Sequence, residues 1–110
     1  MRRSRRRRRG RYSKQYGETL VGVAWYDRGQ WTRLRQVAAD PERLEESYEE
    51  WVAMAEKAIR DLKAQGMRIQ RVPVDAEDLI GWCKEQARRL DTSARAEFTS
   101  HQLRKLHLSK

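Results

Sequence analysis

The sequence has few of the residues and none of the long apolar runs that mark several common protein classes. It has one cysteine, Cys83, among 110 residues, which excludes a scaffold held together by intramolecular disulfides. Its longest clearly apolar run covers residues 20–26, whereas a helix needs about 20 apolar residues to cross a bilayer. No small-residue cleavage site follows this run, so it does not resemble a secretion signal. These features predict a soluble protein of a reducing compartment, the cytoplasm, with no membrane partner.

Motifs that are typical of enzymes are also missing. The two histidines, His101 and His107, belong to no HExxH or serine–histidine–aspartate pattern, and there is no glycine-rich phosphate loop. Cys83 lies on the apolar stripe of a predicted helix, without a nucleophile signature around it, so we expect a packed thiol. Its spacing to the histidines matches no common zinc pattern. We therefore predict no catalytic residues, no metal site and no cofactor.

Acidic residues are absent from the first 16 positions, where positive charge is dense. Residues 17–110 hold 16 basic and 16 acidic side chains, so the whole net charge of +9 belongs to the N-terminal segment. Adjacent arginines repel one another, and this segment has few apolar side chains with which to form a core. We predict a disordered basic arm over residues 1–16 and a single small domain over residues 17–110. The basic residues of the arm are Arg2, Arg3, Arg5, Arg6, Arg7, Arg8, Arg9, Arg11 and Lys14.

This arm is the strongest functional signal in the sequence. Guanidinium groups pair with phosphates and release counterions, which gives affinity with little dependence on base sequence. Tyr12 and Tyr16 are placed to stack on unpaired bases. The sequence therefore predicts a small non-enzymatic binding protein whose arm contacts RNA, DNA or another polyanion. Because residues 17–110 carry no net charge, we expect the domain to act as an anchor or as the contact of a homo-oligomer.

The alternative hypothesis is a protein–protein interaction or adaptor module with an incidental basic tail. Such a module would use its helical surface, and Trp82 is its candidate partner contact because it lies off the main apolar stripe of its helix. Trp25, Trp31 and Trp51 lie instead on predicted core faces.

Apolar spacing in the domain predicts the order β-α-α-β-α-α. Residues 19–26 are expected to form a strand that is covered on both faces, since both alternating sets are apolar or small. A short helix over 29–39, capped by Asp27, follows. A second strand is expected over 67–74, where Pro73 indicates an edge strand or one that stops at Val72.

The longest predicted helix covers residues 41–65, with Asp40 as its N-cap, Pro41 at its first position and Gly66 after its end. One face is an apolar stripe of Leu44, Tyr48, Trp51, Ala55, Ile59 and Leu62. The other carries an acidic cluster of Glu42, Glu45, Glu46, Glu49 and Glu50. This helix has no histidine, so we interpret the cluster as a solvated face rather than a metal site. A further possibility is that the cluster holds the basic arm.

Two more helices complete the predicted domain. One covers 76–90, is capped by Asp75, and buries Leu79, Cys83, Ala87 and Leu90. The other covers 94–106 with weak periodicity and has Phe98, Leu103 and Leu106 as its apolar anchors. The expected fold class is α+β and mostly helical, with a small two-stranded sheet covered by helices. The direction of strand pairing is left open.

Overall fold

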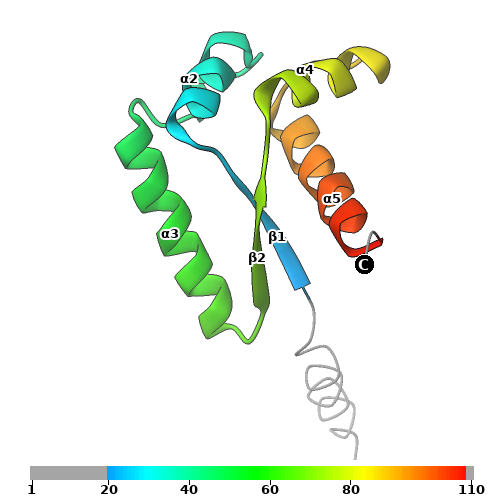
Figure 1. Ribbon diagram of the computed structural model, residues 1–110. Helices are drawn as coiled ribbons and strands as arrows, with labels where there is room; N and C mark the ends of the chain where they lie inside the picture. Colours follow the sequence, from blue (N-terminus) through cyan, green and yellow to red (C-terminus); the bar gives the residue numbers. More distant parts are fainter. Residues whose placement is uncertain (1–19, 109–110) are drawn as a thin grey trace, which may run out of the picture.

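Figure 1 shows a computed structural model of the chain, which describes residues 20–108. Helices α3 and α5 flank a two-stranded sheet, and α2 and α4 lie at the end where the strands finish (Figure 1). The predicted fold class and element order are confirmed. The elements are β1 (Leu20–Trp25), α2 (Arg28–Val37), a 3-10 turn η2 (Pro41–Arg43), α3 (Tyr48–Ala64), β2 (Arg68–Pro73), α4 (Ala76–Glu85) and α5 (Thr92–Leu108).

The two strands pair in parallel, in a register that runs from Leu20 opposite Arg68 to Trp25 opposite Pro73. Within residues 20–108 each strand has one neighbour, and Pro73 lies on an edge strand of this two-stranded sheet as predicted. Helix α5 approaches β1 closely at Gly22. A Cβ atom built there would lie 3.1 Å from Leu103 Cδ2. The absence of a side chain at Gly22 therefore lets the helix pack against the sheet.

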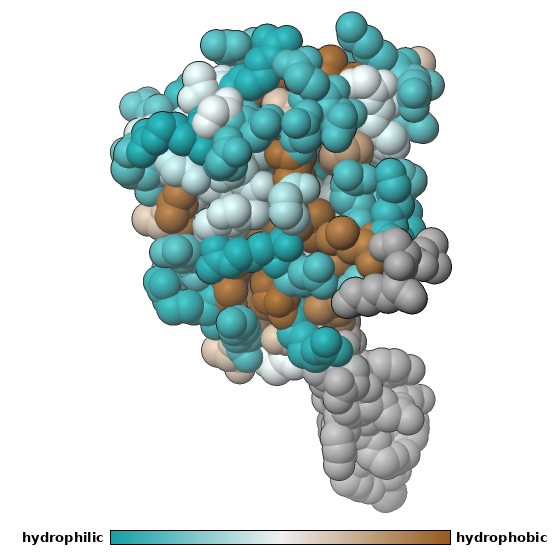
Figure 2. Space-filling model, viewed as in Figure 1, coloured by the Kyte–Doolittle hydropathy of each residue, from teal (hydrophilic) through white to brown (hydrophobic). Residues whose placement is uncertain are grey.

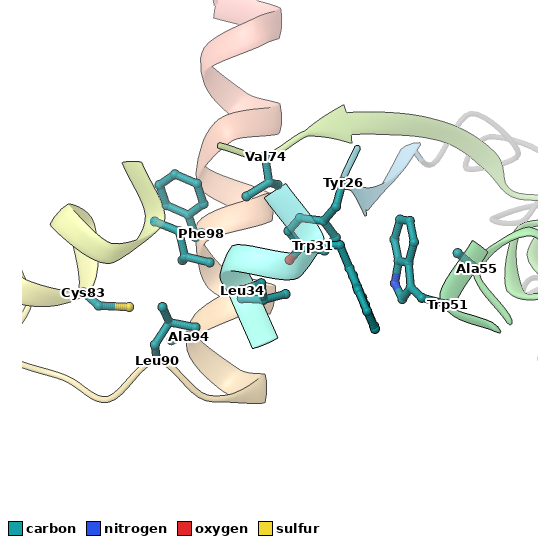
Figure 3. Close-up of a cluster of buried hydrophobic side chains, with 11 residues drawn as sticks. Tyr26, Trp31, Leu34, Trp51, Ala55, Val74, Cys83, Leu90, Ala94 and Phe98 are labelled. Atoms are coloured by element: carbon teal, nitrogen blue, oxygen red, sulfur yellow. The ribbon is translucent and has the colours of Figure 1, made fainter. Parts of the chain in front are cut away.

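The buried core lies toward the end where the strands finish. Figure 3 shows its side chains converging from α2, α4, α5 and the ends of both strands. Trp51 is 5% exposed, and its ring centroid lies 5.0 Å from that of Trp25 and 5.3 Å from that of Tyr26. Trp31 and Trp51 are buried as predicted, whereas Trp25 is half-buried between Trp51 and the guanidinium of Arg71.

Two predicted N-caps and one predicted helix stop are confirmed. The Asp27 side chain accepts a hydrogen bond from the Gln30 amide, and Asp75 accepts one from the Asp78 amide. Gly66, at φ +92°, follows the end of α3 in the left-handed conformation that glycine adopts at little cost.

The prediction of one helix over 41–65 is wrong, because the chain breaks between η2 and α3. Pro41 begins only a 3-10 turn, Leu44 is extended, and Ser47 is the residue that caps α3 through the Glu50 amide. Asp40 makes no capping bond, since its carboxylate binds Thr92 and Arg95 of α5 instead. Because the Asp40 carboxylate is engaged by Arg95, it does not cap a helix that starts at Pro41, and the predicted long helix relied on that cap.

The prediction that Ala87 lies on a buried helical face is also wrong. Helix α4 ends at Glu85, and Ala87 is exposed at φ +54°. The Arg88 amide donates to the Cys83 carbonyl and the Ala87 amide to the Lys84 carbonyl, which are the two bonds of a Schellman stop. A helix stop of this kind usually has glycine at the residue with positive φ. Here that residue is alanine, so the sequence does not indicate the stop.

Helix α5 is longer than predicted at both ends, and one expected anchor is wrong. Phe98 is buried, but Leu106 is 39% exposed. Asp91 accepts a hydrogen bond from the Ala94 amide and so supports the start of the helix.

Candidate functional site

The basic residues predicted to bind nucleic acid, from Arg2 to Lys14, lie outside the described residues, as do Tyr12 and Tyr16. The point where the chain enters the domain is described. Leu20 begins β1 opposite Arg68, at the end of the sheet where both strands start. Lys14 precedes Leu20 by six residues in the sequence.

The described part of the chain carries 15 basic and 15 acidic residues, but the acids gather at one end while the basic residues are divided between both ends. We define the basic end as residues 20–22, 57–71 and 101–108, and the core end as residues 23–56 and 72–100. The basic end joins the start of both strands to the last turns of α3 and α5 (Figure 1). The His107 ring nitrogen Nε2 lies 3.0 Å from Gln70 Oε1, which places the end of α5 against β2.

Basic side chains dominate the basic end, which has seven of them and one acid. That acid, Asp61, is 2.9 Å from Lys57 Nζ, so the two neutralise each other. Lys105 lines a hollow together with Glu77, Asp78 and Glu85 of α4. The other exposed basic residues of this end are Arg60, Lys63, Arg68, Arg71 and Arg104, of which Arg71 lies over the Trp25 ring at 3.8 Å from its centroid.

The core end has the opposite balance, with eight basic and fourteen acidic residues. Several of its arginines are held by carboxylates. Arg33 Nε lies 2.7 Å from Glu77, Arg88 Nη1 2.7 Å from Glu97, and Arg28 pairs with Glu49. The excess negative charge and the engaged arginines make this end a poor surface for a polyanion.

One ion pair of the core end is partly buried. Arg95 Nη1 lies 2.7 Å from Asp40 Oδ1, and the two side chains are 11% and 15% exposed. Hydrogen bonds from Arg95 and Thr92 hold the pKa of the Asp40 carboxyl well below its usual range. The pair joins the chain after α2 to the start of α5, so it has a structural role.

A groove of about 530 Å³ lies beside β1. Gly22, Val23 and Ala24 form its floor, and α3 and α5 form its walls. Hydrophobic residues are visible between these two helices, with hydrophilic residues around them (Figure 2). Tyr26 lies at this groove, and burial raises its pKa to about 12, so it keeps its proton at neutral pH.

Trp82, the candidate partner contact, is half-buried rather than freely exposed. Its ring centroid lies 5.5 Å from that of Phe98, and the Arg88 guanidinium lies 5.5 Å from its ring. His101 is a third neighbour, with ring centroids 6.5 Å apart. Much of the indole surface therefore serves packing between α4 and α5.

The acidic cluster does not form one helical face. Only Glu49 and Glu50 lie on α3, while Glu42 lies on η2 and Glu45 and Glu46 lie between the two elements. Within residues 20–108, no group of three histidine, cysteine or acidic side chains is placed to hold a metal ion.

Cys83 is 4% exposed, and its Sγ lies 4.0 Å from the Arg89 carbonyl oxygen. Burial raises the pKa of this thiol. A buried thiol with a raised pKa holds little thiolate at neutral pH, as expected for a packing residue.

No protein-family model, curated protein or solved structure shows significant similarity to the chain. Among the described helices, none is both long and apolar enough to cross a membrane.

Sequence reasoning missed the basic end because it used the net charge of the whole domain. A local signal exists, since residues 62–74 and 98–110 contain no acid. These two stretches are far apart in the sequence. The tertiary structure brings β2 and the last turns of α3 and α5 to the same end of the domain.

Proposed function

We propose that this protein binds nucleic acid through its N-terminal basic segment, mainly by contacts to the phosphate backbone. The observation that carries the proposal is the distribution of charge. Residues 1–16 hold nine basic side chains and no acid, while residues 20–108 hold equal numbers of both signs. Excess positive charge of this density is a source of affinity for phosphates whatever the base sequence.

The salt dependence of binding provides a quantitative test. If five to eight of the nine charges meet phosphates, the logarithm of the binding constant should fall with the logarithm of salt concentration with a slope of about −4 to −7. Fluorescence anisotropy with a labelled oligonucleotide of arbitrary sequence, single-stranded and duplex, measures this slope between 50 and 300 mM salt (roughly the range over which it is steep).

A charge-removing variant and a charge-retaining variant make the test specific. Replacing the five arginines at positions 5–9 by glutamine should make the slope shallower by about 4, because each contact contributes about 0.7 to 0.9. Replacing them by lysine should preserve most of the affinity, since contacts that depend on charge alone do not need the guanidinium fork.

Two results would contradict the proposal. In the first, the glutamine variant binds as tightly as the parent chain, which would place the affinity elsewhere. In the second, the slope is shallow and one base sequence is strongly preferred, which would indicate base-specific contacts from an ordered surface.

A further inference from the structure

We infer that the basic end of the domain is a second phosphate-binding surface, which extends the site of the N-terminal segment. The inference rests on the proposed function, because it assigns additional contacts for the same nucleic acid. It departs from the expectation that the domain acts only as an anchor. A net charge of zero does not describe a domain that has fourteen of its fifteen described acids at one end and seven basic residues with one acid at the other.

The position of the chain entry supports this inference. Leu20, the first described residue, lies opposite Arg68 at the basic end. Since only six positions separate Lys14 from Leu20 in the sequence, the basic end is the part of the described domain that follows the basic segment most directly. The acidic core end is at the far end of the strands, so the domain presents its attractive surface toward the same ligand.

Local structural roles do not account for the whole pattern. The negative end of the helix dipole favours Lys63 in the last turn of α3. Charge on an exposed strand edge discourages pairing with other strands and favours Arg68 and Arg71 on β2. The dipole also disfavours acids, but its effect falls off within the last turn, so it does not explain why α5 has no acid after Glu97. A surface that meets phosphates needs that absence.

The test compares two variants of the full chain with the same net charge. The first carries Arg60→Gln, Lys63→Gln and Arg104→Gln at the basic end. The control carries Arg43→Gln, Lys84→Gln and Arg89→Gln at the core end. All six side chains are exposed, and none forms an ion pair with a partner in residues 20–108, so both variants should retain the circular dichroism spectrum and melting temperature of the parent.

We expect the basic-end variant to bind an oligonucleotide about 10- to 100-fold more weakly at 100 mM salt, with a slope shallower by about 2. The control should change affinity by less than about threefold and leave the slope unchanged, because its residues lie away from the ligand. A third variant, with Arg60→Lys and Arg104→Lys, should bind like the parent because the charge is retained.

The possible failures are distinguishable. If the parent binds with the expected slope but the basic-end variant binds equally well, this inference is wrong and the proposed function stands. If both triple variants weaken binding equally, only net charge matters and this inference is again overturned. If the parent shows no salt-dependent binding, the proposed function fails and this inference fails with it.

Discussion

The two ends of the domain differ both in packing and in charge. The core end contains every member of the main cluster of buried apolar side chains, together with fourteen of the fifteen described acids. Among the described residues of the basic end, Ile59 is the only one that is buried, at 6% exposed. The difference indicates that the core end supplies most of the stability, and our proposal assigns phosphate contacts to the basic end.

The largest expected effect tests whether the core end supplies the stability. Trp51→Ala should lower the free energy of unfolding by about 3–5 kcal/mol, because it empties the centre of the aromatic cluster. Leu62→Ala, at a half-buried position of the basic end, should cost about 1–2 kcal/mol. Chemical denaturation measures both, and equal losses would contradict the comparison.

A smaller effect concerns the ion pair that joins the chain after α2 to α5. Asp40→Asn should lower the free energy of unfolding by about 2 kcal/mol. The amide can still accept a hydrogen bond from Arg95, but the charge of this largely buried guanidinium then has no carboxylate partner at position 40. The pair also predicts a direction for pH dependence. The folded pKa of Asp40 lies below its unfolded value of about 3.9, so its stabilisation is complete above that value and declines as pH falls further.

The melting temperature between pH 6 and pH 2 (approximately the range of carboxyl titration) measures this dependence. The Asp40→Asn variant should lose less stability than the parent over this range, since it has no carboxylate to protonate at position 40. Parallel pH profiles for the two proteins would show that the pair makes no net contribution.

A third prediction tests how tightly the core end excludes solvent. The Cys83 thiol is buried and its pKa is raised, so it should react with a thiol reagent at pH 7 more than about tenfold more slowly in the folded protein than in denaturant. The comparison uses the same chain in both states. Native labelling as fast as that of free cysteine would indicate an open core end and would reopen the question of a reactive thiol.

The smallest expected effect concerns the backbone conformation of Ala87, just after the end of α4. Ala87 is held at φ +54°, a conformation in which a Cβ atom is unfavourable. Ala87→Gly should therefore stabilise the protein by about 0.5–1 kcal/mol, even though it removes a methyl group and increases backbone freedom in the unfolded chain. A loss of stability, measured by the shift in denaturation midpoint, would show that the Schellman stop is not formed in solution.

Much of the secondary structure follows from signals within a few residues of one another. The caps at Asp27 and Asp75 and the stop at Gly66 were predicted from sequence because each depends only on neighbouring backbone groups. The failed prediction of one helix over 41–65 has a long-range cause. Asp40 resembles a cap in sequence, but its strongest partner, Arg95, lies 55 residues away.

The candidate site likewise has one part that the sequence predicts and one part that depends on long-range contacts. The density of arginine before position 12 is visible in the sequence, because charge along a segment needs no fold to be counted. The basic end of the domain depends on which helix ends and strand ends meet, and local signals do not determine that meeting. Sequence alone thus determined the elements, their order and the basic N-terminal segment. The tertiary structure decided the parallel pairing, the break before α3 and the separation of charge, because each depends on contacts between residues far apart in the chain.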